Sequence, residues 1–346
     1  MNEMTAPPTA ADAVKLTAKD FATDQEVRWC PGCGDYAILK CMQRTLPDLG
    51  VTRENTVFVS GIGCSSRFPY YMNTYGFHTI HGRAPAVATG LKLANPDLDV
   101  WVVTGDGDGL SIGGNHLLHA LRRDVDLNIL LFNNKIYGLT KGQYSPTSDI
   151  GTRSPSTPQG SIDPTVNPIS FALGANARFA ARTVDTAQKH MPEVFTRAHG
   201  FKGASFVEIL QNCIVYNDAA WKSVTEKNVV ADRQLLLKHG EKMLFGANGD
   251  KGIRFNTATF ALEVVTIGTD DITADDVLTH DETNLQLARM LAELGSNPDE
   301  PMAMGVLYAA PADTTYEAAV LADARAQRGK RTLKDVLFSG QTWEVA

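Results

Sequence analysis

Short apolar runs alternate with amphipathic segments along residues 35–210, and this alternation constrains the fold more than any other feature of the sequence. The runs are rich in β-branched side chains and are bounded by Gly, Asn or Asp, as buried parallel strands tend to be. The predicted strands are Thr56–Ser60, Val100–Thr104, Asn128–Phe132 and Ser205–Leu210. The predicted helices are Asp35–Leu46, Ala84–Ala94, Asn115–Arg123 and Thr186–His199. Strands separated by helices predict an α/β fold, a parallel sheet flanked by helices that binds ligands at the carboxyl ends of its strands.

The chain is predicted to have three parts. Residues 1–20, rich in Ala, Thr and Pro, are expected to form a flexible tail, residues 21–230 the α/β domain, and residues 231–346 a C-terminal extension. Within the extension, Thr283–Leu294 is predicted to be a helix and Ala303–Ala309 an edge strand. Tyr144–Pro168 is rich in Pro, Ser and Thr and predicts a long irregular loop, which in a compact domain is usually functional or disordered.

Composition excludes several classes of protein. The formal net charge is −7, whereas a nucleic-acid-binding surface normally shows a basic patch, so no nucleic-acid partner is expected. The chain has no apolar stretch of about 18 residues, so no transmembrane helix is expected. Its start lacks the basic and apolar regions of a signal peptide. We therefore expect a cytoplasmic protein.

Two polar stretches follow neighbouring predicted strands. The second strand runs into Gly-Asp-Gly-Asp-Gly at 105–109, and the third ends at Asn133 and Asn134, the latter 28 residues after Asp106. This spacing fits a strand end, a crossover helix and the next strand, which places both strand ends at one edge of the sheet. Mg²⁺ prefers such oxygen ligands, with diphosphate and water completing its octahedron. Asp106 and Asn134 therefore predict a magnesium–diphosphate site, although Gly-Asp-Gly alone fits an ordinary strand-to-helix turn equally well.

Four of the five cysteines are spaced so that they could meet. Cys30 and Cys33 form a Cys-Pro-Gly-Cys stretch, and Cys64 and Cys213 each follow a predicted strand, at the edge expected to carry the Mg²⁺. Four thiolates could bind a [4Fe–4S] cluster there. Zinc is an alternative, although structural Cys₄ zinc sites usually have two close pairs; a redox dithiol is another. Cys41, in a predicted helix, is expected to be a small buried apolar residue.

Together and in this order, these motifs resemble the β subunits of two-subunit 2-oxoacid:ferredoxin oxidoreductases. The resemblance covers about residues 25–220 and implies a thiamine-diphosphate-binding fold. The matching motifs are Cys-Pro-Gly-Cys-Gly (30–34), Gly-Ile-Gly-Cys-Ser-Ser (61–66), His-Gly-Arg (81–83), Gly-Asp-Gly-Asp (105–108), Gly-Gly-Asn-His (113–116), Asn-Asn-Lys-Ile-Tyr-Gly-Leu-Thr-Lys-Gly-Gln (133–143) and Cys213.

The resemblance implies three cofactors: thiamine diphosphate, Mg²⁺ and a [4Fe–4S] cluster. The implied cluster ligands are Cys30, Cys33, Cys64 and Cys213. Mg²⁺ would be bound by the side chains of Asp106 and Asn134 and by the backbone carbonyl of Ile136. The residues implied around thiamine diphosphate are Ile62, Gly63, Cys64, Ser65, His81, Gly82, Arg83, Gly107, Asp108, Gly138 and Leu139. Of these, His81 could instead be a hydrogen-bonded core histidine.

The resemblance also implies a reaction and partners. The reaction is oxidative decarboxylation of a 2-oxoacid with coenzyme A, giving an acyl-CoA and CO₂ and passing electrons through the cluster to a ferredoxin. A β chain of this family binds only the diphosphate half of thiamine. An α subunit would supply the pyrimidine-binding domain, in a heterodimer or a dimer of heterodimers.

Substrate choice depends on Lys141, because Leu-Thr-Lys-Gly-Gln (139–143) resembles the branch that uses 2-oxoglutarate. Its ammonium group could pair with the distal carboxylate of 2-oxoglutarate, giving succinyl-CoA as product. Lys141 could also be a solvated loop lysine, and the substrate could be pyruvate or a range of 2-oxoacids. Two other hypotheses are acetolactate-synthase-like or decarboxylase chemistry, which needs no cysteines, and a zinc-stabilised, non-catalytic binding subunit.

Overall fold

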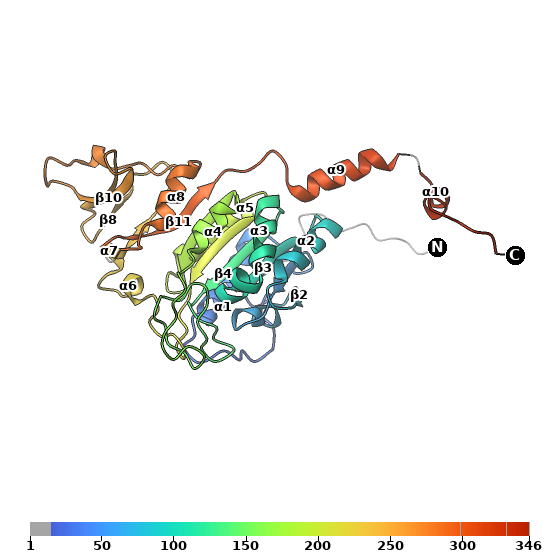
Figure 1. The fold of residues 1–346 in the computed structure, drawn as a ribbon, viewed down its shortest axis with the longest axis horizontal. Coiled ribbons are helices and arrows are strands. Elements are labelled where there is room, and N and C mark those ends of the chain that lie inside the picture. The colour runs from blue at the N-terminus through green and yellow to red at the C-terminus, as the bar shows by residue number, and fades with distance from the viewer. Residues whose placement is uncertain (1–14, 298, 330, 346) are drawn as a thin grey trace.

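The computed structural model describes residues 15–297, 299–329 and 331–345, and within them an eight-stranded sheet forms the body (Figure 1). The strand order is β2-β1-β3-β4-β6-β5-β11-β7. The strands are β1 (Thr56–Ser60), β2 (Tyr75–His78), β3 (Asp99–Gly105), β4 (Asn128–Asn133), β5 (Phe179–Val184), β6 (Ser205–Leu210), β7 (Gln234–Leu236) and β11 (Met302–Ala309). Neighbours from β2 to β5 are parallel, so the predicted fold class is confirmed.

Helices cover both faces of this sheet, because successive side chains of a strand point to opposite faces. The helices are α1 (Asp35–Leu49), α2 (Ala84–Ala94), α3 (Gly114–Arg123), α4 (Pro168–Gly174), α5 (His190–Gly200) and α8 (Leu285–Glu293). On β1, Val57 and Val59 pack in the core that includes α2, α3 and α4, while Phe58 packs in the core that includes α1 and α5.

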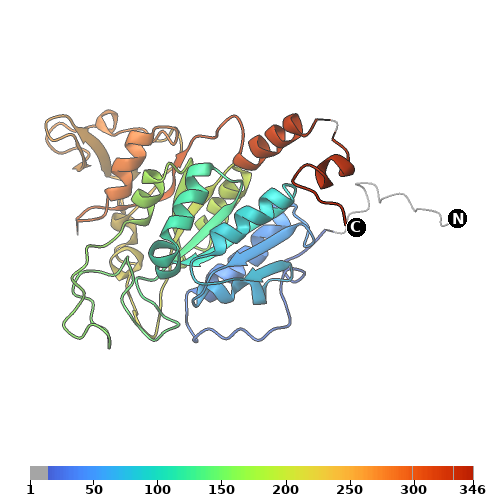
Figure 2. The same ribbon diagram turned by 45° about the vertical axis from the view of Figure 1, so that its right-hand side comes forward.

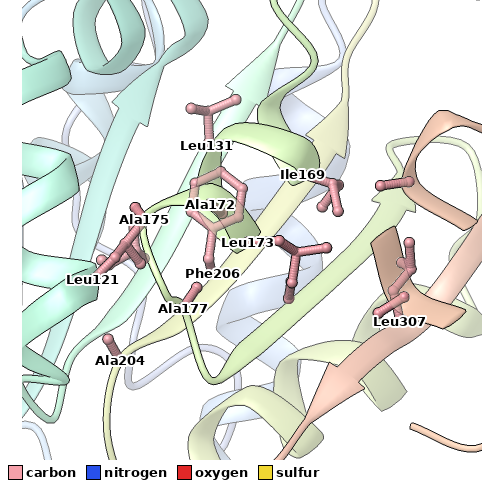
Figure 3. Close-up of a cluster of buried hydrophobic side chains, with 14 of the residues drawn as sticks. Leu121, Leu131, Ile169, Ala172, Leu173, Ala175, Ala177, Ala204, Phe206 and Leu307 are labelled. Atoms are coloured by element: carbon pink, nitrogen blue, oxygen red, sulfur yellow. The ribbon is translucent and has the colours of Figure 1, made fainter. Parts of the chain in front are cut away.

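The first of these cores joins α4 to two strands. Ile169 and Leu173 of α4 pack with Phe206 of β6, and Leu307 of β11 belongs to the same cluster (Figure 3). All four side chains are at most 1% exposed. This packing connects the central parallel strands to the part of the sheet formed late in the chain.

The four predicted strands and four predicted helices are all present, with small shifts at their ends. The helix predicted from Thr186 begins instead at His190. The cause is Asp185, whose backbone N–H donates to Leu210 O at the end of β6 (3.0 Å) and whose carboxylate accepts from Asn212 N just after it (2.8 Å). Residues 185–189 therefore form a turn rather than a helical start.

Several elements inside the α/β domain were not predicted, among them the strands β2 and β5 and the short helix α4. Arg182 interrupts the apolar run of β5, which hides it from a pattern search. Its guanidinium is buried and paired with Glu208 of β6 at 2.7 Å. A buried charge is tolerated because it is paired, and that pairing cannot be read from β5 alone.

The chain beyond residue 230 contributes to the same sheet. The helix predicted at Thr283–Leu294 is confirmed as α8, but the prediction that Ala303–Ala309 is an edge strand is wrong. β11 lies between β5, to which it is antiparallel, and the three-residue β7, to which it is parallel. β7 is short enough to carry no periodic signal, so the outer partner of β11 was not visible in the sequence.

The rest of the C-terminal part consists of smaller elements. Their bounds are α6 (Lys222–Thr225), α7 (Val230–Arg233), β8 (Leu244–Phe245), β9 (Lys251–Asn256), β10 (Ala261–Thr266), α9 (Tyr316–Arg328) and α10 (Leu333–Leu337). β8, β9 and β10 form a separate antiparallel sheet. In Figures 1 and 2, α9 and α10 extend away from the main sheet. Residues 1–14 of the predicted N-terminal tail lie outside the described residues, and within the described ranges no helix is long and apolar enough to cross a membrane.

Candidate functional site

A small cleft of about 60 Å³ lies at the carboxyl ends of β1, β3 and β4. It is lined by Ile62, Gly63, Cys64, Ser65, His81, Gly105, Asp106, Gly107, Asp108, Phe132, Asn134, Ile136, Tyr137, Gly138, Leu139 and Thr140. All three predicted Mg²⁺ ligands are among these residues, as are the predicted thiamine neighbours except Gly82 and Arg83. Ligand pockets usually measure about 300–1,000 Å³, so this cleft can enclose only part of a cofactor.

Asp106 is held in the cleft by a loop whose role the sequence did not reveal. Its carboxylate is 2% exposed, and its Oδ2 accepts hydrogen bonds from Ser145 Oγ and Thr147 Oγ1, both at 2.6 Å. Burial raises the pKa of Asp106 to about 6, against the lowering effect of these two hydroxyls. The signal available in the sequence was the Ser- and Thr-rich loop that follows the asparagine motif.

Asn134 and Ile136 lie in the turn that leaves β4. Lys135 between them has a left-handed φ of 56°, and Asn134 Oδ1 accepts a hydrogen bond from Ile136 N at 3.2 Å. Side-chain hydrogen bonds of this kind are how Asn stabilises tight turns. Lys135 Nζ pairs with Asp149 at 2.7 Å and lies 4.3 Å from the centre of the Trp221 ring. The turn thereby brings an amide oxygen to the cleft that Asp106 also lines.

Asp108 holds together the two loops that border the cleft. Its Oδ1 accepts hydrogen bonds from the backbone N–H groups of Ile62 (3.0 Å) and Gly82 (2.7 Å), and its Oδ2 accepts one from Thr104 Oγ1 (2.6 Å). His81 Nδ1 lies 2.8 Å from the same Oδ1, and the His81 side chain is 34% exposed. His81 is therefore a border residue of the cleft rather than a core histidine, and Asp108 both lines the cleft and joins its two bordering loops.

The predicted residues Gly82 and Arg83 do not line the cleft but contact the residues next to it. Arg83 Nη1 donates to the carbonyls of His81 and Ile112, both at 3.3 Å. Gly82 has a φ of 70°, and a Cβ there would lie 2.4 Å from Gly113 N. This close approach of two backbones requires glycine.

Glycines at the predicted motif positions allow neighbouring groups to pack closely around the cleft. A Cβ on Gly107 would lie 2.3 Å from the ring of Tyr137. The Tyr137 hydroxyl donates to the carbonyl of Gly107 at 2.9 Å. Gly61 lies just before the cleft residues, and a Cβ on it would lie 1.9 Å from Asp108 Oδ2. These positions exclude side chains because neighbouring groups already occupy the space.

Four cysteines gather next to the cleft, and the fifth lies apart. Cys64 lines the cleft itself, and an ideal Cβ on Gly138 would lie 3.4 Å from Cys64 Sγ and 3.6 Å from Cys213 Sγ. Burial, then the charge of Asp35, then Cys213 and Cys30 raise the pKa of Cys64 to about 12. The pKa of Cys33 is likewise raised, first by burial and then by Asp35 and the thiols of Cys213 and Cys64. Cys64 thus interacts electrostatically with the other three thiols.

The segments that carry Cys33 and Cys213 are fastened to each other. Gly34 N donates to Asn212 O at 3.1 Å, and Gln211 Nε2 donates to Cys33 Sγ at 3.3 Å. Asp185 Oδ2 accepts from Asn212 N, and an ideal Cβ on Gly34 would lie 1.9 Å from that oxygen. Neither Gln211 nor Asp185 was identified from the sequence, because their contacts join segments far apart in the chain.

The spacing of the thiols bears on which metal they could bind. Among the described residues, all five cysteines are free, and no three His, Cys, Asp or Glu side chains are close enough together to hold one metal ion. A zinc site needs its sulfurs about 2.3 Å from a single ion. In a [4Fe–4S] cluster each thiolate binds a different iron, which requires wider spacing. The two kinds of site therefore require different distances between the four sulfurs.

Lys141 does not line the cleft, although its neighbours Leu139 and Thr140 do. It is exposed and has a left-handed φ of 74°, and its backbone N–H donates to Gly138 O at 3.1 Å. The Lys141 side chain therefore belongs to the surface of the turn at the mouth of the cleft. Cys41, in contrast, is buried within α1, with its Sγ 3.9 Å from Thr45 Oγ1.

A larger cavity of about 380 Å³ adjoins this site but contains none of the predicted ligands. It is lined in part by Asn133, Lys135 and Thr147 and by the buried pair of Arg182 and Glu208. Because the predicted Mg²⁺ ligands all line the smaller cleft, we place the functional site there.

Comparison with known proteins gives three kinds of match. Residues 61–209 match the family described as thiamine pyrophosphate enzyme, C-terminal TPP binding domain. The chain is 50% identical over 333 residues to 2-oxoglutarate oxidoreductase subunit KorB of Mycobacterium tuberculosis, covering 94% of this chain and 88% of that protein. It is 47% identical over 198 residues to 2-oxoacid:ferredoxin oxidoreductase 1, subunit beta, of Aeropyrum pernix, covering 57% and 62% of the two chains.

A solved structure extends the similarity to the whole fold. It is the 2-oxoglutarate:ferredoxin oxidoreductase from Magnetococcus marinus with 2-oxoglutarate, coenzyme A and succinyl-CoA bound. The two chains superimpose with a TM-score of 0.75 at 30% sequence identity, over 96% of this chain and 98% of that one.

Proposed function

Because this chain belongs to the β subunits of 2-oxoacid:ferredoxin oxidoreductases and contains their thiamine-diphosphate-binding domain, we propose that it forms part of an enzyme that oxidatively decarboxylates 2-oxoglutarate with coenzyme A. The products are succinyl-CoA, CO₂ and reduced ferredoxin. One observation carries the proposal: a buried carboxylate, an amide oxygen and four free cysteines share one edge of the sheet. Acetolactate-synthase-like chemistry would use the oxygen ligands but leave the cysteines without a role.

The oxygen donors of the cleft suit a magnesium-bound diphosphate. In the proposal, Asp106 and Asn134 hold Mg²⁺ by their side chains and Ile136 by its carbonyl, an all-oxygen set of the kind this cation prefers. Gly107 has no side chain, which lets the Tyr137 ring pack against the backbone that lines the cleft. When bound, thiamine diphosphate supplies the electron sink for loss of CO₂ from a 2-oxoacid. Asp108 keeps the bordering loops in place through its hydrogen bonds to Ile62 and Gly82.

In the same proposal Cys30, Cys33, Cys64 and Cys213 hold the [4Fe–4S] cluster. The cluster supplies transfer of single electrons from the thiamine site to ferredoxin. Cys64 supports this arrangement because it lines the cleft, and because its sulfur and that of Cys213 both lie close to Gly138. The two cofactors would therefore lie on either side of Cys64. Cys30 is the exposed member of the four, which leaves that side accessible to an electron acceptor.

An α subunit is proposed to close the site. The cleft of about 60 Å³ holds only part of a cofactor, and large apolar side chains are exposed beside it. Ile80, Ile112 and Leu139 are 73%, 54% and 49% exposed. Such exposed apolar surface beside a site indicates that another chain covers it. We propose a heterodimer or a dimer of heterodimers.

The function is tested with the chain coexpressed with its α subunit and purified without oxygen. We expect a brown complex that reduces ferredoxin only when 2-oxoglutarate and coenzyme A are both present, and no activity from this chain alone. A colourless protein containing zinc would contradict the proposal and support a zinc-stabilised binding subunit. Equal rates with pyruvate and 2-oxoglutarate would mean that the enzyme accepts a broad range of 2-oxoacids.

Substrate choice is tested at Lys141, which we propose pairs with the distal carboxylate of 2-oxoglutarate. Lys141→Ala should lower kcat/KM for 2-oxoglutarate by about tenfold, the effect of losing one charge-assisted hydrogen bond. Turnover of pyruvate, which has no distal carboxylate, should change little. Lys227→Ala, at another exposed lysine, is the control. Equal losses on both substrates would mean that Lys141 supports the turn instead.

A further inference from the structure

Three buried side chains of one loop carry hydroxyls that lie close together. They belong to Ser145, Thr147 and Ser148 and are called here the hydroxyl bracket. They are 2%, 1% and 3% exposed, although they belong to a long loop rich in Pro, Ser and Thr. Burying a hydroxyl is unfavourable unless it is hydrogen-bonded, so a buried set within such a loop requires specific partners.

The first partner of the bracket is Asp106, the proposed carboxylate ligand of Mg²⁺. Ser145 Oγ and Thr147 Oγ1 each lie 2.6 Å from the same oxygen, Asp106 Oδ2. Two donors on one oxygen fix the rotation of the carboxylate about its Cβ–Cγ bond. The other oxygen, Oδ1, is then the one that can face a cation.

The second partner is the turn that carries the remaining proposed ligands. Ser148 Oγ donates to Lys135 O at 2.5 Å, between Asn134 and Ile136. Ser145 N in turn donates to Ser148 Oγ at 2.8 Å, so the two ends of the bracket are joined. The bracket therefore connects Asp106, at the end of β3, to the turn after β4.

Thr147 also approaches Asn133 Oδ1, at 2.9 Å. A hydroxyl has one proton, so Thr147 can donate to Asp106 or to Asn133 but not to both at once. An ionised carboxylate is the stronger acceptor, and Asn133 Oδ1 has a second donor in Lys135 N at 3.2 Å. Thr147 therefore serves Asp106 when that carboxylate is charged.

We propose that the hydroxyl bracket consists of positioning residues, which set the geometry of the magnesium ligands before the cation binds. This inference rests on the proposed function and adds residues to the same site. Groups that hydrogen-bond to metal ligands typically account for about 10–100-fold in metal affinity. The bracket should act at that level because it holds both ligand-bearing segments.

The experiment uses the complete complex with the α subunit, freed of cofactor by a chelator. In one measurement, Mg²⁺ is titrated at a fixed concentration of thiamine diphosphate, and the bound cofactor is measured after rapid filtration. In a second measurement, Mn²⁺ replaces Mg²⁺, and the bound Mn²⁺ is counted by electron paramagnetic resonance. Thr147→Val and Ser145→Ala should each weaken cation affinity by about 10–100-fold. Thr147→Ser, which keeps the hydroxyl, should restore it.

The matched control is Thr157→Val in the same loop, because Thr157 Oγ1 bonds only locally, to Ser154 Oγ at 2.6 Å. Its cation affinity should equal that of the unmodified complex. Iron content should be unchanged in all variants, because a general structural defect at this edge of the sheet would lower it. If Thr147→Val fails to assemble, Ser145→Ala carries the test, since it removes a single oxygen atom.

Wild-type affinity in Thr147→Val and Ser145→Ala would overturn the inference while leaving the proposed function intact. Equal loss in Thr147→Ser and Thr147→Val would also overturn it, because packing rather than the hydroxyl would then be responsible. If the unmodified complex shows no Mg²⁺-dependent binding of thiamine diphosphate, the proposed function and the inference both fail.

Discussion

Asp106→Ala should abolish Mg²⁺-dependent retention of thiamine diphosphate by the assembled complex. Asp106 is the one carboxylate in the proposed ligand set, and neither Asn134 nor Ile136 can replace its charge. Removing groups that only support metal ligands already costs about 10–100-fold in affinity, so loss of the ligand itself should exceed about 100-fold. The measurement is the thiamine diphosphate that remains with the protein after gel filtration in Mg²⁺.

The variant should still fold, which separates this result from simple unfolding. Burial raises the pKa of Asp106 to about 6, so its charged form is not what stabilises the cation-free protein at neutral pH. Asp97→Ala, at an exposed loop carboxylate, is the control and should retain cofactor. Cofactor retained by Asp106→Ala as well as by the unmodified complex would show that the proposed cation site is wrong.

Cys213→Ser should remove most of the iron, and Cys41→Ser should remove none. Cys213 follows β6 and lies beside Cys64 across Gly138, whereas Cys41 is buried inside α1. A cluster that loses one of four thiolates is no longer closed by protein ligands. The measurement is iron per chain in anaerobically purified complex, together with its visible absorption.

Cys41→Ser is a matched control because the new hydroxyl has a partner nearby, Thr45 Oγ1, which lies 3.9 Å from the present sulfur. Cys30, Cys33 and Cys64 changed to Ser should each behave like Cys213→Ser. Normal iron in Cys213→Ser, or iron lost from Cys41→Ser, would remove the basis for assigning the cluster to these four residues.

Much of the site was predictable because its signals are local. The strand before Asp106 and the strand before Asn134 were visible as short apolar runs, and parallel strands place their ends at one edge. Glycines marked close backbone approaches, as at Gly107 beside Tyr137. Thus the short motifs by themselves predicted the cleft, its oxygen donors and the nearby cysteines, and their joint resemblance to one family predicted the cofactors.

Hydrogen-bond partners were not predictable in the same way. Ser145 and Thr147 contact Asp106 across 39 and 41 residues of chain, and Asp185 fastens the segment after β6 to the one before α1. A Ser, Thr or Asp in an irregular segment looks the same whether it is solvated or buried. Its partner is decided only when the sheet and its loops have packed.

The sequence by itself determined the parallel sheet and the composition of its ligand-binding edge, because periodicity, glycine and motif spacing act between near neighbours. Only the tertiary structure decided that β11 lies inside the sheet, that Arg182 is buried against Glu208, and that Asp108 accepts hydrogen bonds from two separate loops. Each depends on burial and pairing between distant segments. Those energies arise from the packed fold and leave no periodic trace in the sequence.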